Sequence, residues 1–304
     1  MELGFVSALF PELSFTEVLT LAAQEGFTAV EVMCWPVGVA ERKYAGVTHI
    51  DVTQLTQTKA EDILAECQEN RVCISGLGYY PNMLDPSPAV SNAAIAHFKK
   101  IIAAAPLLGV QTVNGFVGRD WTKTVDDNWP TFLHTWQPLV RFAEEHGVRI
   151  GIENCPMLFT RDEWPGGKNL FTTPAIWKRA FADIDSPNFG LNYDPSHMIL
   201  QDMDAIAPLA EFKDKLFHIH AKDVTLNRVA LDDVGRFDFP LRWHTPCIPG
   251  YGEIDWPHFF AALLRSGYNN AVCIEVEDDS FGGTLAGRKQ ALRVSRNMLK
   301  PFFG

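Results

Sequence analysis

The chain has 304 residues, 47% of them hydrophobic and 21% charged, a composition typical of a globular protein with a large core. Its formal net charge of −11 would repel phosphate backbones and anionic lipid, which argues against nucleic acid and membrane surfaces as partners. No run approaches the roughly 20 apolar residues that a membrane span requires, and residues 1–5 lack the basic and apolar regions of a signal peptide.

Short apolar segments alternate with longer amphipathic ones along the whole chain. The first expected helix, residues 14–25, begins at Ser14 and Glu17, which have the spacing of a capping box, and is closed by Gly26. The expected strands are residues 3–9, 28–33, 72–77, 110–116, 148–153, 188–194, 216–221 and 271–276. The remaining helices are expected at 53–70, up to 108, up to 146, from 173, and at 203–213, 256–266 and 285–299.

Strands that alternate with helices of this length pair in parallel through crossover helices. Eight such units without a linker predict one α/β domain over residues 1–304, a (β/α)8 TIM barrel. No Gly-x-Gly-x-x-Gly follows the first strand, which disfavours a dinucleotide-binding sheet. The longest irregular stretch, residues 224–250, follows the seventh strand and is expected to be a lid or a substrate wall.

The six cysteines, at 34, 67, 73, 155, 247 and 273, contain no Cys-x-x-Cys pair. Most lie inside apolar runs such as Val72-Cys73-Ile74, which predicts buried free thiols. This pattern is typical of a reducing compartment and argues against a disulfide framework or a zinc ribbon, so we expect a cytoplasmic protein.

Polar side chains end four of the late strands, where barrel enzymes have their active sites. Two glutamates, an aspartate and a histidine at adjacent strand ends would repel one another or compete for space unless a cation lay between them. Mixed carboxylate and imidazole ligands suit Mn²⁺, Co²⁺, Mg²⁺ or Zn²⁺. The ligands expected from this reasoning are Glu153, Asp194, His220 and Glu275.

Two other residues on the same strands, His218 and Glu277, are alternative candidates for metal ligands. His218 points to the same side of its strand as His220 but lies deeper, so it is expected in the barrel interior. Glu277 shares the parity of Glu275 and lies further out, and Glu275 is preferred. A single carboxylate after a strand is usually a helix cap, and a single histidine is usually a hydrogen-bonded structural group. It is the combination of four on consecutive strands that favours a metal site.

Several motifs resemble those of a known family. They are Ile152-Glu153-Asn154, Asp194-Pro195-Ser196-His197, His218-Ile219-His220-Ala221-Lys222-Asp223, the segment from Pro249 to Trp256, and Ile274-Glu275. Together they resemble the xylose-isomerase-like TIM barrel superfamily, and within it the sugar phosphate isomerase/epimerase family. That group includes ketose 3-epimerases, inosose dehydratase and enzymes acting on 3-keto-glycosides.

The resemblance implies the same four metal ligands and a substrate contact for His197. In the epimerases the two glutamates also act as acid and base on opposite faces of the sugar, which would give Glu153 and Glu275 a double role. A carbon next to a carbonyl loses its proton, and the metal stabilises the resulting enediolate. We expect one divalent metal ion, with Mn²⁺ preferred.

The chain also departs from the ketose 3-epimerases, which carry a second Glu and an Arg close to their first and third ligand motifs. Here Glu153 is followed by Asn-Cys-Pro-Met and His220 by Ala-Lys-Asp, a form closer to the inosose dehydratase and keto-glycoside branches. Lys222 would then act on the substrate as an acid or a cationic clamp, or else form a salt bridge with Asp223.

Other residues give weaker signals. Trp35, Trp243 and His244 are expected to contact substrate, although each would equally serve as packing. Phe237 and Phe239 in the long loop would close over substrate or pack against the barrel or a neighbouring subunit. Arg119 and Asp120 follow the fourth strand and would meet a substrate hydroxyl. The chain has no glycine-rich phosphate cradle.

The sequence therefore predicts a metal-dependent isomerase or epimerase of a keto sugar, inosose or keto-glycoside. The alternative is a lyase, in which the same enediolate expels a β-oxygen. A DNA-repair endonuclease of the same barrel class would need a basic groove and more metal ligands, and a non-catalytic sugar-binding barrel would not need intact ligands. Dimers and tetramers are common among the relatives that the chain resembles, so a homo-oligomer is compatible with this prediction.

Overall fold

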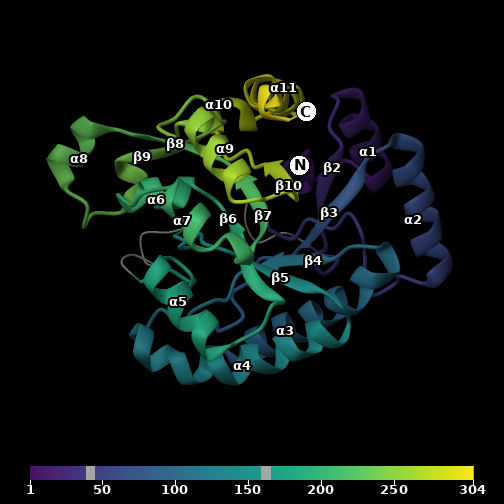
Figure 1. Cartoon of the computed structure of the whole chain (residues 1–304), viewed down its shortest axis with the longest axis horizontal. Helices are drawn as coiled ribbons and strands as arrows, with labels where there is room; N and C mark the ends of the chain where they lie inside the picture. The colour runs from purple at the N-terminus through teal and green to yellow at the C-terminus, as the bar shows by residue number, and fades with distance from the viewer. Residues whose placement is uncertain (39–44, 159–165, 304) are drawn as a thin grey trace.

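Eight parallel strands close into a barrel surrounded by helices in the computed structural model, which describes residues 1–38, 45–158 and 166–303 (Figure 1). The strand order around the barrel is β1-β10-β7-β6-β5-β4-β3-β2, and each neighbouring pair is parallel. The predicted (β/α)8 TIM barrel is confirmed. The barrel strands are β1 (Glu2–Val6), β2 (Ala29–Met33), β3 (Cys73–Gly78), β4 (Thr112–Gly115), β5 (Arg149–Glu153), β6 (Phe189–Tyr193), β7 (Leu216–Ala221) and β10 (Ala271–Ile274).

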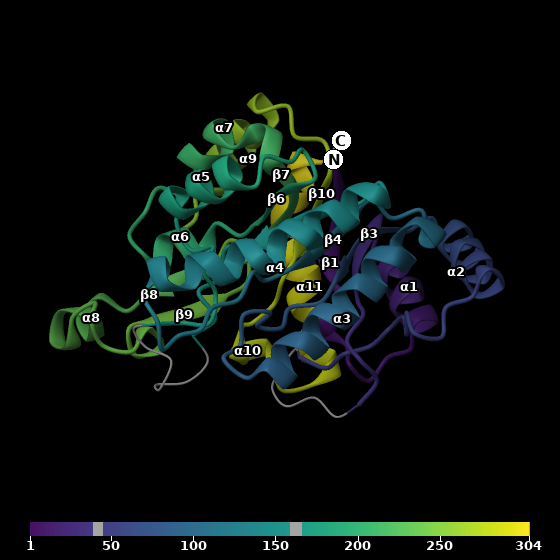
Figure 2. The same ribbon diagram turned by 90° about the horizontal axis from the view of Figure 1, so that it is seen from below.

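The helices pack around the barrel, with α3 and α4 on one flank and α1 and α2 on another (Figures 1 and 2). Ser14 and Glu17 form the predicted capping box at the start of α1. Side-chain caps also start other helices, as Asp255 does for α9. The helices are α1 (Phe15–Gln24), α2 (Gln57–Asn70), α3 (Pro88–Ala104), α4 (Val125–Glu145), α5 (Pro174–Asp183), α6 (Ser196–Leu200), α7 (Ala207–Glu211), α8 (Arg228–Val234), α9 (Trp256–Arg265), α10 (Asp279–Gly282) and α11 (Leu285–Leu299).

Two of the predicted element boundaries are wrong for identifiable local reasons. The first strand ends at Val6, because Ser7–Leu9 turn into a 3-10 helix instead of extending. The predicted helix 203–213 is reduced to α7. The Asp204 side chain accepts hydrogen bonds from Ile206 N at 2.7 Å and Ala207 N at 3.2 Å, which stabilises a turn and delays the start of the helix.

The stretch after β7 is longer than a normal connection, as predicted, but it is not irregular. β8 (Asp223–Leu226) and β9 (His244–Cys247) form an antiparallel pair outside the barrel, and α8 lies between them in the chain. The pair and α8 project from one side of the molecule in both views (Figures 1 and 2). Leu241, His244 and Pro246 of this projection line the cavity described below, so it forms part of one wall of the site.

The main hydrophobic core fills the space between the barrel and its helices. Its largest fully buried side chains include Trp136, Trp177 and Trp256. Buried aromatic rings of this size contribute much of the stability of such a core. The core holds the barrel strands in register, so that the residues at their carboxyl ends are set on a rigid frame.

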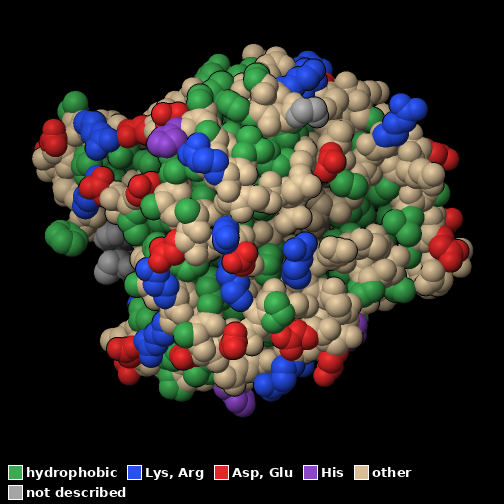
Figure 3. Space-filling model, viewed as in Figure 1, with side chains coloured by type: hydrophobic (Ala, Val, Ile, Leu, Met, Phe, Trp, Pro, Cys, Tyr) green, Lys and Arg blue, Asp and Glu red, His purple; other side chains and the backbone are tan. Residues whose placement is uncertain are grey.

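The six cysteines are free thiols, and four of them are buried: Cys34, Cys67, Cys247 and Cys273. The prediction that Cys73 is buried is wrong, because it opens β3 at the rim of the barrel and is exposed. On the face shown in Figure 3, acidic and basic side chains are intermingled. Within the described ranges, no helix is both long and apolar enough to cross a membrane.

Candidate metal centre and active site

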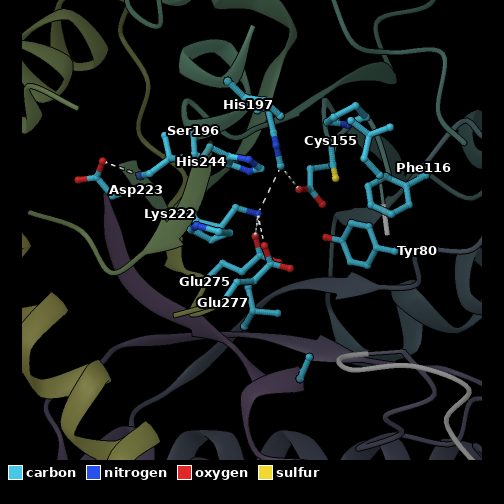
Figure 4. Close-up of a pocket in the computed structure, with 18 of the residues that line it drawn as sticks. Tyr80, Phe116, Cys155, Ser196, His197, Lys222, Asp223, His244, Glu275 and Glu277 are labelled. Atoms are coloured by element: carbon cyan, nitrogen blue, oxygen red, sulfur yellow. Dashed lines mark hydrogen bonds and ion pairs between the residues drawn. The ribbon is translucent and has the colours of Figure 1, made fainter. Parts of the chain in front are cut away.

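A cavity of about 380 Å³ opens at the carboxyl ends of the barrel strands, which is a volume typical of a small-molecule site. Its two walls differ in chemistry, and Tyr80 and Phe116 lie across the cavity from Lys222 and Glu275 (Figure 4). The wall from β1 to β4 is apolar and aromatic: Val6, Ala8, Met33, Trp35, Tyr80 and Phe116. The wall from β5 to β10 carries the reactive groups: Glu153, Cys155, His197, Lys222, His244, Glu275 and Glu277.

Three of the four predicted metal ligands meet in one cluster. One oxygen each of Glu153 and Glu275 and one ring nitrogen of His220 all lie within 4.8 Å of one another. His220 Nδ1 is 3.7 Å from Glu153 Oε2 and 3.7 Å from Glu275 Oε2. This nitrogen is buried and has no hydrogen-bond partner among the described residues. A lone pair that is buried, unpartnered and aimed between two carboxylates fits a divalent metal ion.

Asp194, the fourth predicted ligand, is fully buried but lies outside that cluster. Its Oδ1 accepts a hydrogen bond from Ser196 N at 2.8 Å. Its Oδ2 lies 3.1 Å from Lys222 Nζ and 3.3 Å from His197 Nε2, and makes no hydrogen bond of good geometry within the described part of the chain. The carboxylate therefore faces the site, and the Lys222 ammonium links it to Glu275.

Lys222 is buried among acidic side chains, and its amino group points toward Glu275 and Glu277 (Figure 4). Nζ lies 2.7 Å from Glu275 Oε2 and 3.1 Å from Glu277 Oε2. Together with Asp194, these carboxylates outweigh the cost of burial and raise the pKa of Lys222 well above its usual value. Lys222 is therefore a charged group held at the wall of the cavity.

The alternative expectation, a salt bridge between Lys222 and Asp223, is wrong. The Asp223 carboxylate points away from the cluster (Figure 4) and anchors the segment that leads into α9. Its oxygens accept hydrogen bonds from Gly250 N at 3.0 Å, Ile254 N at 3.2 Å and Trp256 Nε1 at 2.8 Å. Successive side chains of an extended segment point to opposite sides, so Asp223 and Lys222 are separated.

The two glutamates of the cluster have opposite electrostatic environments. Burial would raise the pKa of Glu153, but the hydrogen bond from His197, the neighbouring His220 ring and the Lys222 charge outweigh it, and the pKa is lowered. Burial raises the pKa of Glu275 to about 7. The Lys222 charge opposes this rise only in part, and the negative charge of Glu153 adds to it. Carboxyl groups whose pKa values are pushed apart are a common arrangement in acid–base sites.

Glu277 also faces Lys222 but lies further from the cluster and is more exposed than Glu275, with 32% against 19% of its side chain accessible. His197 lines the cavity, with Nε2 3.3 Å from both Glu153 Oε1 and Lys222 Nζ. Trp35 and His244 line it too, although Trp35 also packs edge-on against Tyr79 with ring centroids 4.9 Å apart.

Other sequence-predicted contacts lie away from the cavity. Trp243 is buried with Leu200 and Leu226, where it packs the projecting strand pair onto the barrel. Phe237 is 95% exposed, and neither it nor Phe239 lines the cavity. Arg119 donates hydrogen bonds to the Lys123 carbonyl of its own loop and to the Gly166 carbonyl of the loop after β5, and Asp120 accepts one from Thr122. Packing therefore accounts for Trp243, and hydrogen bonds to nearby loops account for Arg119 and Asp120.

Sequence reasoning missed the aromatic side chains Tyr80 and Phe116, and also Cys155 and Glu31. Cys155 lies near Glu153 and His197, within the same 4.8 Å limit. Glu31 lies beneath His220 in the barrel interior, with 0% exposure. A signal for Glu31 was present, since it is the one charged residue in the apolar strand Ala29-Val30-Glu31-Val32-Met33. A charge in a fully buried strand requires a partner, but the sequence does not say which.

Replacing Gly252 by alanine should destabilise this site. A Cβ there would lie 2.5 Å from Asp223 Cγ and 2.6 Å from Val224 N, so it would push the anchoring carboxylate away. Overpacking of this kind costs about 1–3 kcal/mol. Urea unfolding should show that loss. Gly283→Ala, whose Cβ would have no atom of the described residues within 4 Å, is the matched control and should unfold like the wild type. Equal stability of both variants would contradict the prediction.

Comparisons with known proteins agree with this architecture. A family model described as "Xylose isomerase-like TIM barrel" matches residues 19–302. An uncharacterized protein of Bacillus subtilis, YfiH, is 24% identical over 312 residues, covering 91% of this chain and 93% of the relative. An inosose dehydratase of Salmonella typhimurium is 20% identical over 277 residues, covering 88% of this chain and 83% of the relative.

Solved structures give the same answer for the fold. D-psicose 3-epimerase of Clostridium cellulolyticum, solved with D-tagatose, superposes with a TM-score of 0.69 at 18% identity and covers 99% of both chains. The IOLI protein, solved with a bound zinc atom, superposes with a TM-score of 0.72 at 19% identity and covers 100% of both. At these identities the likeness shows a shared fold.

Proposed function

The chain belongs to the xylose isomerase-like TIM-barrel family, and on that basis we propose that it is a divalent-metal-dependent isomerase or epimerase. Its substrate would be a keto sugar, an inosose or a keto-glycoside. The observation that supports this most is the cluster of Glu153, His220 and Glu275 on the wall of a small-molecule cavity. Between the two carboxylates lies a buried imidazole nitrogen that has no hydrogen-bond partner among the residues described.

The ion would be held by Glu153, Asp194, His220 and Glu275, with Mn²⁺ preferred and Co²⁺, Mg²⁺ or Zn²⁺ as alternatives. When bound, it would supply the positive charge that stabilises an enediolate oxygen. A zinc-bound structural neighbour and the donor set of this chain support a divalent metal. Asp194 Oδ2, which is buried and makes no good hydrogen bond to any described residue, is the group that would turn toward the ion.

The protein's own groups would carry the protons. Glu275 would exchange a proton with the carbon next to the carbonyl, and Glu153 would act on the opposite face. His197 and Lys222 would bind substrate hydroxyls from the polar wall. The apolar wall, including Trp35 and Phe116, would exclude water from the reacting carbons.

The alternative is a lyase of the same site. Here the enediolate expels a β-hydroxyl or glycosidic oxygen, and a proton donor is needed on that oxygen. Lys222 supports this candidate because its ammonium faces the cavity beside Glu275, where its charge would stabilise the departing oxygen, and Glu275 would pass to that oxygen the proton it took from carbon. An inosose dehydratase among the relatives also supports it. The two reactions share their first step, so one experiment can test both.

That experiment follows solvent deuterium into the substrate. Purified protein with Mn²⁺ is incubated in D₂O with free ketoses, inososes and 3-keto-glycosides, and proton NMR follows each compound. Chelator-treated protein is the control. We expect deuterium next to the carbonyl with the metal-loaded protein alone, and the product, an epimer or an unsaturated ketone, decides between epimerase and lyase. Bound metal without exchange in any compound would refute the proposed chemistry, whereas failure to bind metal would refute the ligand assignment.

We further propose that residues 1–304 form one domain and that the protein works in the cytoplasm, and a homo-oligomer is compatible with this proposal. The free thiols support a reducing compartment. The oligomeric state can be measured by light scattering during gel filtration.

A further inference from the structure

A layer of polar side chains lies inside the barrel directly beneath the proposed metal ligands. Its centre is Glu31 on β2, a carboxylate with no solvent exposure. Glu31 Oε2 lies 2.5 Å from His220 Nε2, and Oε1 accepts hydrogen bonds from Asn114 Nδ2 at 3.2 Å and from the Tyr80 hydroxyl. Barrel interiors are normally filled by bulky branched apolar residues. A carboxylate that accepts three hydrogen bonds in that place needs a specific explanation.

Glycines occupy the barrel positions next to this polar layer, where a larger residue would not fit. A Cβ at Gly78 would lie 2.8 Å from Glu31 Oε1, and a Cβ at Gly76 would lie 2.9 Å from Asn114 Nδ2. A Cβ at Gly151 on β5 would collide with Asn114 Oδ1. Glycine within a strand weakens it and commonly marks a close approach by another group. The three glycines thus leave room for the Glu31 and Asn114 side chains, at a cost in the stability of their strands.

The hydrogen bonds assign the proton on His220. Asn192 Nδ2 lies 3.0 Å from both His220 Nε2 and Tyr80 Oη, and Tyr80 Oη can accept its hydrogen. Tyr80 then donates to Glu31, and His220 Nε2–H donates to the other oxygen of that carboxylate. An imidazole whose Nε2 donates a proton presents Nδ1 as the nitrogen for a metal. That nitrogen is the one facing Glu153 and Glu275.

His218 shows the contrast on the same strand. Its Nδ1 lies 3.0 Å from Asn192 Oδ1 and its Nε2 lies 3.0 Å from Ser75 Oγ, so both ring nitrogens are engaged. Its Nδ1 is 3.8 Å from Glu31 Oε2, too far for a hydrogen bond. Of the two histidines of β7, only His220 is hydrogen-bonded to the Glu31 carboxylate. It is also the one whose other ring nitrogen has no hydrogen-bond partner within the described structure.

We propose that Glu31 is the positioning residue of the metal centre. It accepts the Nε2 proton of His220, fixes the orientation of the ring, and makes Nδ1 the metal-binding nitrogen. The inference rests on the proposed function only where a metal is concerned, because the hydrogen bond between His220 Nε2 and Glu31 is present in the metal-free protein as well. A carboxylate behind a metal-bound histidine also raises the basicity of the ligand, and its loss commonly lowers metal affinity 10–100-fold.

The first test needs no metal. Nitrogen-15 NMR of histidine-labelled, metal-free protein reports which ring nitrogen carries the proton, and the His220→Gln spectrum identifies the His220 signals. We expect the wild type to show a protonated, hydrogen-bonded Nε2 at His220, and Glu31→Gln to change that signal while leaving His218 close to its original position. An Nε2 of His220 that carries no proton in the wild type would overturn the proposal.

The second test measures metal affinity directly. Mn²⁺ and Co²⁺ are titrated into wild type and Glu31→Gln in competition with a chelator, and we expect the Kd to rise about 10–100-fold in the variant. Glu25→Gln is the matched control, because Glu25 is also buried and hydrogen-bonded but pairs with Arg293 far from the site. It should leave the Kd unchanged whatever it does to stability.

Tyr80→Phe provides a milder variant in case Glu31→Gln does not fold. It removes one donor to Glu31 and should raise the Kd by a smaller factor than Glu31→Gln. If Glu31→Gln folds and binds metal with an unchanged Kd, the positioning role is refuted, whether or not the variant is active. If the wild type binds neither ion, the proposed function fails, and the NMR measurement still decides the tautomer.

Discussion

Replacing Glu275 by glutamine is expected to lower the rate of deuterium exchange into substrate by about 10²–10⁴-fold. Glutamine keeps the size of the side chain and one oxygen for a metal, but it cannot take up or return a proton. Glu275 Oε2 belongs to the cluster with Glu153 and His220, and burial raises the pKa of Glu275 to about 7. The variant should bind metal more weakly, so it is assayed at saturating Mn²⁺, where metal content shows that the site is filled and the exchange rate shows the loss of the chemical step.

Glu277→Gln is the matched control for that prediction. Glu277 offers an oxygen to the same lysine, 3.1 Å from Nζ, but stands outside the metal-ligand cluster and is the more exposed of the two carboxylates. We expect its exchange rate to stay within about tenfold of the wild type, since a surface-facing ion pair contributes little. The reverse result, with Glu277→Gln inactive and Glu275→Gln active, would move the acid–base role to Glu277.

Replacing Lys222 by methionine should destabilise the metal-free protein by about 3–5 kcal/mol. Methionine fills a similar volume but leaves Asp194, Glu275 and Glu277 facing one another without the ammonium that now neutralises them. Unpaired buried charge is costly, and part of the cost would be relieved by proton uptake on the carboxylates. Urea unfolding of chelator-treated protein measures the loss.

Metal should recover part of that stability, because a divalent ion bound by Asp194 and Glu275 would supply the missing positive charge. The difference between Lys222→Met and wild type is thus expected to shrink when both are unfolded with excess Mn²⁺. Lys178→Met is the control, since Lys178 pairs with Glu211 at the exposed surface, and it should cost at most about 1 kcal/mol. A Lys222→Met variant as stable as this control would show that the buried ion pairs are unimportant.

The predicted strands and helices were largely right because each buried element leaves a regular pattern of apolar residues in the sequence. Capping and turn residues mark where each pattern ends. Buried parallel strands are continuous apolar runs, and amphipathic helices follow them, so the order of elements can be read from residues near one another in the chain. The same reasoning located Glu153, His220 and Glu275, since the carboxyl ends of parallel strands must meet at one end of a closed barrel.

Where local signals competed, the sequence was less informative. Asp204 binds the backbone ahead of α7 and shortens that helix. The strands β8 and β9 pair across an intervening helix, so their partner could not be found from a turn signal. Trp243 lies among aromatic residues that suggested a substrate contact, but its burial against Leu200 and Leu226 is set by residues distant in the chain.

The sequence by itself determined the barrel, its family and most of the residues that line the polar wall, because these depend on periodicity and on position at strand ends. Only the tertiary structure decided their partners. Glu31 meets His220 across 189 positions of the chain, and Lys222 meets Glu275 across 53. Such pairings follow from strand register, barrel closure and side-chain packing, and none of these has a local signature in the sequence. The apolar residues on either side of Glu31 indicated that its charge is buried, and the fold identified His220 as its partner.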